Sequence, residues 1–123
     1  PWVAKYLHAI RGVRFDNRNS VFFGRDVIID NSHPEYVNIG KNVTICARSI
    51  ILAHKLSLKK ILHRKFSGQL TNLGDNAFIG VSSIIMPGVS LGKNCIVGSG
   101  SVVLKDVKDN EVVAGNPAKK IDS

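Results

Sequence analysis

Hydrophobic positions recur with a period of six along the second half of the chain. An aliphatic residue occupies every sixth position from 73 to 103, and a small or short residue follows each one four positions later. The aliphatic series is Leu73, Ile79, Ile85, Leu91, Val97 and Val103, and the short series is Ala77, Ser83, Val89, Cys95, Ser101 and Val107. Neither a helix of roughly 3.6 residues per turn nor one long strand explains a sustained period of six.

This period predicts short strands joined by corners. Each short residue lies two positions before the next aliphatic residue, so on a strand both side chains point to the same face. Glycine follows four of the aliphatic residues, which suits a corner that needs a positive φ or a close approach of two backbones; these are Gly74, Gly80, Gly92 and Gly98. Three strands and three corners make a coil of eighteen residues, which stacks Leu73 on Leu91, Ile79 on Val97 and Ile85 on Val103. With parallel strands about 4.8 Å apart, the expected fold is a parallel β-helix around a narrow apolar core.

The first half of the chain carries the same repeat with interruptions. Apolar residues at helical spacing predict a short helix over 2–11, which Gly12 ends and which covers the open first coil. Hexapeptides begin at Phe23 and break around Pro34, which belongs in a corner because proline cannot donate to a strand ladder. They resume at Val37 and run to residue 54.

One long excursion, 55–72, separates the two runs of repeats. It is rich in lysine and carries apolar residues at helix-like intervals, so we expect an ordered arm with a functional role. The chain of 123 residues, 44% of them hydrophobic, is then one domain, with a helix and cap over 1–20 and the β-helix over 21–123.

The repeats, together with the ending from Val112 to Ile121, resemble the hexapeptide-repeat acyltransferases, nearest to the galactoside and maltose acetyltransferases and the sugar O-acetyltransferases. The likeness covers roughly Phe23 to Ile121, and period and ending agree in phase. Coils of this family wind left-handed, against the usual right-handed crossover. The resemblance therefore implies an all-β, left-handed parallel β-helix, acetyl-CoA as acyl donor and a homotrimer. A short solenoid also exposes broad faces, which favours association.

The net charge and the cysteine content indicate which kinds of partner and which cellular compartment to expect. The net charge of +8 suits an anionic partner, either nucleic acid or a phosphorylated cofactor. Given the resemblance, we expect acetyl-CoA and a small acceptor, with no nucleic acid. Cys95 at an inward position and Cys46 at a corner do not suggest a disulfide framework, so we expect a reducing, cytoplasmic compartment. No signal peptide or long apolar run is apparent, so we expect no membrane span.

His54 is the main candidate for chemistry. Acyl transfer from a thioester needs a base near neutral pH to take the proton of the incoming hydroxyl or amine, and histidine titrates in that range. His54 lies where the last strand of the first run meets the excursion, which is where the galactoside-type enzymes keep their catalytic histidine. The alternative is an exposed loop histidine, and His63, within the excursion, is a weaker candidate for the same role.

Further residues are candidates for binding. Asp30 and Asn31 follow a strand one coil before His54 and either hold the acceptor, as the resemblance implies, or serve as ordinary corner residues. The resemblance also implies a coenzyme A groove between subunits whose contacts fall at Val81, Ser99, Leu104, Lys105 and Lys119. Val81 would contact the cofactor through its backbone, while the two lysines would meet phosphates. The alternative for each lysine is a solvated surface.

We therefore predict an acetyl-CoA-dependent acetyltransferase acting on a hydroxyl or amine of a sugar or other small acceptor, with no metal. Two other functions remain open. A metal enzyme resembling the γ-class carbonic anhydrases needs three histidines converging between subunits on one zinc, and the spacing of His54 and His63 does not resemble that pattern. A non-catalytic trimeric scaffold would bind anionic ligands through the basic segment 55–65.

Overall fold

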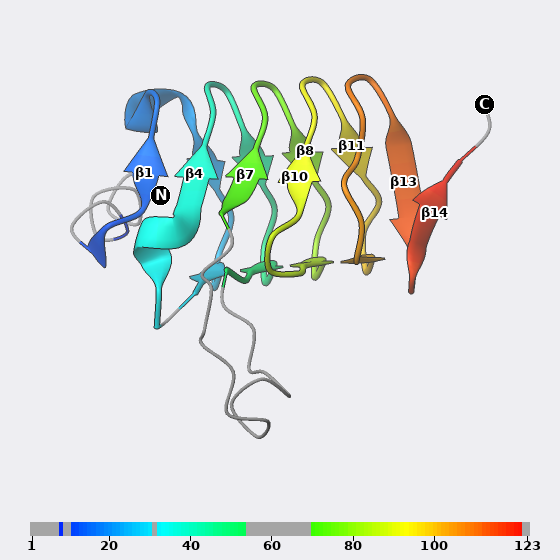
Figure 1. The fold of residues 1–123 in the computed structure, drawn as a ribbon, viewed down its shortest axis with the longest axis horizontal. Coiled ribbons are helices and arrows are strands. Elements are labelled where there is room, and N and C mark those ends of the chain that lie inside the picture. The colour runs from blue at the N-terminus through cyan, green and yellow to red at the C-terminus, as the bar shows by residue number, and fades with distance from the viewer. Residues whose placement is uncertain (1–7, 9–10, 31, 54–69, 122–123) are drawn as a thin grey trace.

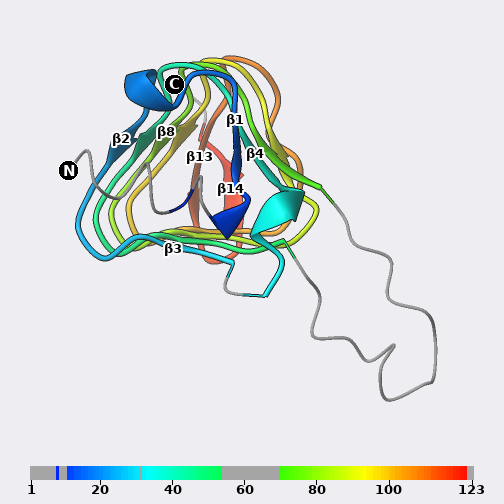
Figure 2. The same cartoon turned by 90° about the vertical axis from the view of Figure 1, so that its left-hand side faces the viewer.

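The structure is a computed structural model that describes residue 8 and residues 11–30, 32–53 and 70–121. Short parallel strands form three sheets, and these are the three faces of a prism (Figure 1). Viewed along its axis, the prism is triangular (Figure 2). The first sheet contains, in order, β1 (Arg14–Phe15), β4 (Val37–Ile39), β7 (Thr71–Leu73) and β10 (Ser90–Leu91). The second contains β2 (Phe22–Phe23), β5 (Thr44–Ile45), β8 (Phe78–Ile79), β11 (Ile96–Val97), β13 (Val112–Gly115) and β14 (Ala118–Lys120). The third contains β3 (Ile28–Ile29), β6 (Ile50–Ile51), β9 (Ile84–Ile85) and β12 (Val102–Val103).

The period of six sets the register of these sheets. Leu73 pairs with Leu91, Ile79 with Val97 and Ile85 with Val103, as predicted. Every residue of the aliphatic and short series is at most 4% exposed. The predicted parallel stacking and narrow apolar core are therefore confirmed.

Two kinds of residue form the corners: non-glycine residues with positive φ, and glycines where two coils approach closely. The non-glycine residues with positive φ lie three positions after an inward residue of the repeat, with φ between 57° and 63°: Asp26, Asn42, Arg48, Asn76, Ser82, Asn94 and Asn110. The predicted positive φ at Gly74, Gly80, Gly92 and Gly98 is wrong, because these glycines are absent from that region of backbone space. The alternative, close approach, is correct: a Cβ on Gly80 would lie 2.5 Å from the backbone nitrogen of Ser99.

The last coil departs from the period. Val107 pairs with Leu91 and Val113 with Val97, so these partners are sixteen residues apart where eighteen are expected. Val107 therefore takes an aliphatic position, not the short position that the pattern predicted. Lys105 and Glu111, each two positions before one of these valines, stand where earlier coils bury apolar side chains. The chain then turns back, and β14 pairs antiparallel with β13.

The boundaries of the repeats also differ from the sequence pattern. β1 pairs in parallel with β4, so Arg14 and Phe15 belong to the first coil although the pattern placed its start at residue 21. The excursion is shorter than predicted, because Thr71 and Asn72 already belong to β7. Two short 3-10 helices lie at corners of the first and second coils: η1 (Arg18–Ser20) and η2 (Pro34–Tyr36).

Most of the predicted N-terminal helix lies outside the described residues. His8 and Arg11 are described and are helical. Gly12 has φ of 110°, and the Val13 N–H donates to the His8 carbonyl at 3.1 Å, which is the bonding pattern of a glycine-capped helix end. The His8 ring lies 5.2 Å from that of Phe23, so this helix end contacts the first coil. In the described part of the chain, no helix has the length and apolar character needed to span a membrane.

The outer faces of the sheets differ in polarity. On the first sheet, Asn38 donates to Asn72 at 2.9 Å, and Asn72 donates to Ser90 at 3.2 Å, which forms a polar ladder along the prism. The second sheet exposes a mainly apolar column in which Thr44 lies between Phe22 and Phe78. Phe22, Phe78 and Ile96 in this column are 60%, 42% and 43% exposed. The third sheet exposes Ile28 and the partly buried side chains stacked on it: Ile50, Ile84 and Val102.

Candidate functional site

The predicted site residues fall at different corners of the prism. His54 and Asn31 lie outside the described residues. Asp30 follows β3, at the corner between the third and first sheets. We call this the excursion corner because the described chain breaks off there after Ala53 and resumes at Leu70. Leu104 and Lys105 lie at the same corner three coils after Asp30. Val81 and Ser99 lie at the corner between the second and third sheets, which we call the serine corner after the buried Ser49, Ser83 and Ser101.

Asp30 is buried inside the excursion corner, at 1% exposed. Its Oδ1 accepts hydrogen bonds from the backbone N–H groups of Ser32 at 2.9 Å and His33 at 2.8 Å, and its Oδ2 accepts one from Ala53 N–H at 2.7 Å. The Arg11 guanidinium donates to the carbonyls of Ile29 and Asp30 from the other side, at 2.9 and 2.8 Å. Both carboxylate oxygens of Asp30 therefore accept hydrogen bonds from backbone N–H groups. Of the two roles that the sequence allowed for Asp30, this arrangement corresponds to the corner residue and not to the acceptor ligand.

Thr71, which the sequence analysis did not single out, lies on the far side of the same corner. It is 0% exposed, and its hydroxyl donates to the Leu52 carbonyl at 2.7 Å and accepts from Gly88 N–H at 3.0 Å. The available signal was a threonine two positions before Leu73, where the repeat places an inward side chain. Leu52 and Ala53, the two residues before His54, are thus bonded to buried side chains from the coils on either side.

At the serine corner, Val81 and Ser99 meet. The Val81 N–H donates to Ser99 Oγ at 3.1 Å, and the Val81 carbonyl accepts from Gly100 N–H at 2.8 Å. The predicted backbone contact of Val81 with coenzyme A would therefore compete with bonds already formed. Val81 as a whole is 37% exposed, and with its N–H and carbonyl already bonded its side chain is left for contact with a ligand.

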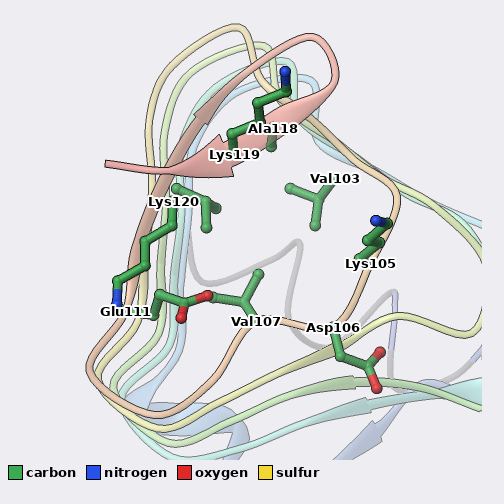
Figure 3. A pocket seen from close by; sticks show the side chains of 9 residues that line it. Val103, Lys105, Asp106, Val107, Glu111, Ala118, Lys119 and Lys120 are labelled. Atoms are coloured by element: carbon green, nitrogen blue, oxygen red, sulfur yellow. The ribbon is translucent and has the colours of Figure 1, made fainter. Parts of the chain in front are cut away.

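Lys105 and Lys119 line one pocket of 250 Å³ at the C-terminal end of the prism (Figure 3). Its floor is apolar, from Val103, Val107 and Val113, because the short last coil leaves these valines at the end of the core. Its charged residues are Lys105, Asp106, Glu111, Lys119 and Lys120. Three lysines against two carboxylates make the rim favourable for an anionic group beside an apolar one. Val81, Ser99 and Leu104 do not line this pocket; Leu104 is 54% exposed.

The thiols of Cys46 and Cys95 are not activated as nucleophiles. Burial raises the pKa of the Cys95 thiol to about 11, and burial also raises that of Cys46. The reactive form of cysteine is the thiolate, so both remain protonated near neutral pH. Within the described ranges, no three His, Cys, Asp or Glu side chains group in a way that could hold a metal ion.

Comparison with known proteins places these features in a family. Residues 71–105 match the model of the hexapeptide repeat of succinyl-transferase. The chain is 35% identical over 99 residues to the putative acetyltransferase YvoF of Bacillus subtilis, covering 80% of this chain and 55% of the relative. It is 36% identical over 85 residues to the galactoside O-acetyltransferase of Escherichia coli, covering 69% and 40%. A solved galactoside acetyltransferase in complex with coenzyme A superposes with a TM-score of 0.64 at 28% identity, covering 89% of this chain and 58% of that structure.

Fold and repeats thus define a parallel β-helix built from hexapeptides. Residues 71–105 carry the hexapeptide repeat of the matched family model, and the chain is similar in sequence and fold to acetyltransferases. It spans about half the length of the curated relatives that it matches.

Proposed function

We propose that the protein transfers an acetyl group from acetyl-CoA to a hydroxyl or amine of a sugar or another small acceptor. The observation that carries this proposal is the superposition on a galactoside acetyltransferase in complex with coenzyme A, over 89% of the chain. The galactoside O-acetyltransferase among the sequence relatives supports a sugar acceptor. As in that family, the coils would wind left-handed.

His54 would act as the general base. It takes the proton of the acceptor hydroxyl while the oxygen attacks the thioester carbonyl carbon. The resulting oxyanion collapses, the carbon–sulfur bond breaks, and the imidazolium returns the proton to the leaving thiolate of coenzyme A. Direct transfer is supported by the protonated state of Cys46 and Cys95, because neither is prepared to carry the acyl group.

The cofactor would lie along the later coils. Lys105 and Lys119 would meet its phosphates at the rim of the C-terminal pocket. Val81 and Ser99 lie at the serine corner and Leu104 at the excursion corner, so the pantetheine arm would lie between the serine corner of one subunit and Leu104 of its neighbour. Since both oxygens of Asp30 hold backbone N–H groups, contact with the acceptor would fall to Asn31.

We also propose a homotrimer whose interfaces bury the apolar outer columns of the second and third sheets. A three-fold ring uses two different surfaces of each copy, and these two faces carry Phe22, Phe78 and Ile28. The asparagine ladder of the first sheet would face solvent. Phe78→Asp should shift the protein to monomers in sedimentation, whereas Asn72→Asp on the first sheet should leave the trimer intact; monomers in the unmodified protein would exclude the assembly.

The activity is tested with acetyl-CoA and a panel of methyl glycosides and small amines, by following the release of free thiol. We expect acceptor-dependent release from at least one glycoside. Absence of coenzyme A binding would instead favour a scaffold that binds anionic ligands, and activity that depends on added zinc would favour a metal enzyme.

The role of His54 is tested by His54→Ala. We expect kcat to fall by roughly 10² to 10⁴, the usual share of a positioned acid–base group, with coenzyme A affinity unchanged. In the unmodified enzyme kcat/KM should rise with pH through a group that titrates near neutrality, and this limb should be absent from the variant. A variant that keeps its rate would exclude His54 as the base, and His63 would be tested next.

A further inference from the structure

One peptide group at the excursion corner is held by side chains at both of its ends. The Leu52 carbonyl and the Ala53 N–H belong to the same planar peptide unit. Thr71 Oγ1 donates to the carbonyl at 2.7 Å, and Asp30 Oδ2 accepts from the N–H at 2.7 Å. Thr71, Asp30 and Ala53 are each at most 1% exposed. With its oxygen and its hydrogen bonded to different coils, this peptide plane cannot rotate without breaking a buried hydrogen bond, which costs about 1–3 kcal/mol.

The strand ladder does not supply these bonds. Ladder bonding reaches Leu52, whose N–H donates to Ile85 O at 3.0 Å, and the next N–H, that of Ala53, goes to a carboxylate instead. By the pairing of β6 with β9, the position that matches Ala53 in the next coil is Pro87, which has no N–H to satisfy. A buried aspartate of the preceding coil therefore satisfies the Ala53 N–H, and the next coil, which has Pro87 at this position, has no bond of the same kind.

Thr71 is likewise a local substitution in an apolar column. It pairs with Val37 in the preceding coil and lies two positions before Leu73, as Val89 lies before Leu91. Both valines are buried at this inward position, at 0% and 2% exposed. Among the described coils, a hydroxyl occurs in this column only at Thr71, where it contacts Leu52, two residues before His54.

We propose that Asp30 and Thr71 are positioning residues, which fix the Leu52–Ala53 peptide and so set the direction in which the chain delivers His54. This inference rests on the proposed function of His54 as base. Catalysis by a general base depends on placing it within hydrogen-bond reach of the acceptor, and a displacement of about 1 Å can cost on the order of a hundredfold in rate. Asp30, Leu52, Ala53 and Thr71 span the first, second and third coils, so the position of the strand end depends on the rigid solenoid and not on the excursion.

The test uses one isosteric change and its conservative partner. Thr71→Val replaces the hydroxyl with a methyl group, so the bonds to the Leu52 carbonyl and from the Gly88 N–H are lost. It installs the residue of the neighbouring coils, so the variant should fold. Thr71→Ser keeps the hydroxyl. Asp30→Asn keeps one acceptor oxygen and so loses the bond either to Ala53 or to the Ser32 and His33 amides. Ser49→Ala is the matched control, because it also removes a buried hydroxyl bonded to a backbone carbonyl, that of Gly80 at 2.9 Å, but at the serine corner.

The first measurement is amide hydrogen exchange by NMR. In Thr71→Val, exchange of the Ala53 amide should speed up by about tenfold or more, as expected when the peptide loses one of its two side-chain hydrogen bonds. In Asp30→Asn, exchange should speed up by a similar factor either at Ala53 or at Ser32 and His33, whichever amides lose their acceptor oxygen. The Leu52 amide, held by the ladder, should keep its protection. Ser49→Ala should leave the Ala53 amide unchanged.

The second measurement is acetyl transfer from acetyl-CoA to the fastest acceptor of the glycoside panel. In Thr71→Val we expect kcat to fall about ten- to a hundredfold, with coenzyme A affinity unchanged, and Thr71→Ser should recover most of the rate. The neutral limb of the pH profile should persist in Thr71→Val, because the base is still present but displaced. It should be absent from His54→Ala.

The outcomes separate the two proposals. An unmodified protein without transfer, or a His54→Ala variant at full rate, would overturn the proposed function and this inference with it. On an active enzyme in which His54 is needed, unchanged Ala53 exchange or unchanged kcat in Thr71→Val would overturn the inference alone. A fall in kcat equal to that of Ser49→Ala would also overturn it, since the effect would then be general.

Discussion

The serine corner and the excursion corner use buried polar side chains for different purposes. At the serine corner the same bond recurs from coil to coil: Ser49 Oγ donates to the carbonyl of Gly80 at 2.9 Å, and Ser83 Oγ to that of Gly98 at 3.0 Å. At the excursion corner the polar residues differ in each coil, and Asp30 and Thr71 converge on a single peptide group. A repeated polar contact builds the solenoid, whereas an unrepeated one marks where the chain leaves it.

This contrast implies that changes to the buried groups of the serine corner, as distinct from the exposed Val81 and Ser99, should alter stability and leave kcat at saturating acetyl-CoA intact. The largest effect is expected for Gly24→Ala, because a Cβ there would lie 2.4 Å from the backbone nitrogen of Ala47 in the next coil. Forcing two coils apart should lower the free energy of unfolding by about 3 kcal/mol. Gly100→Ala is the control: nothing lies within 4 Å of its Cβ, and only its φ of 71° opposes the change, at about 1 kcal/mol. Urea unfolding compares the two, and equal losses would contradict the close-approach explanation.

A smaller effect is expected from the serines themselves. Ser101 Oγ donates to the Gly98 carbonyl at 2.6 Å and accepts from Gly115 N–H at 3.1 Å, whereas Ser83 Oγ makes one such bond. At about 1 kcal/mol for each lost bond, Ser101→Ala should destabilise the protein by about 2 kcal/mol and Ser83→Ala by about 1 kcal/mol. Thermal unfolding gives the order, and kcat at saturating acetyl-CoA should match the unmodified enzyme. A fall in kcat would mean that this corner also serves the reaction, and the contrast between corners would be lost.

The smallest effect is expected at the pocket rim. Lys105→Ala and Lys119→Ala should each weaken coenzyme A binding several-fold, because an exposed phosphate contact is worth about 1 kcal/mol, and added salt should reduce the difference. Lys93→Ala is the matched control, since this exposed lysine does not line the pocket. Calorimetric titration measures all three. Equal affinities for the rim variants and the control would place the cofactor elsewhere.

The regular part of the fold could be predicted because its signal is local. Each inward pair, such as Ala77 and Ile79, indicates one strand followed by one corner. Six such units in a row show which residues of successive coils stack on one another. The short last coil could not be predicted, because valine is both aliphatic and short, so Val107 fits either series. Only its pairing with Leu91 reveals that two residues are missing.

The candidate site was harder to predict because it depends on contacts between distant residues. The positive φ of Asn76 could have been predicted, because asparagine tolerates the left-handed backbone region. Gly74, two positions earlier, tolerates it as well, so the sequence did not show which of the two residues has positive φ. Thr71 was recognisable as a polar residue at an inward position only once the end of the excursion was known. Asp30 could be read as a corner residue or a ligand, and the choice required the position of Ala53, which is 23 residues away.

The antiparallel pairing of β14 with β13 has a consequence for self-assembly. A parallel solenoid ends in an open strand edge, onto which a second molecule could continue the coil and grow into a filament. Here the outermost strand of the second sheet runs in the opposite direction and carries the exposed Lys119 and Lys120. A molecule approaching in the orientation of the next coil would meet a reversed strand and two positive charges, so continuation of the parallel ladder is disfavoured at this edge.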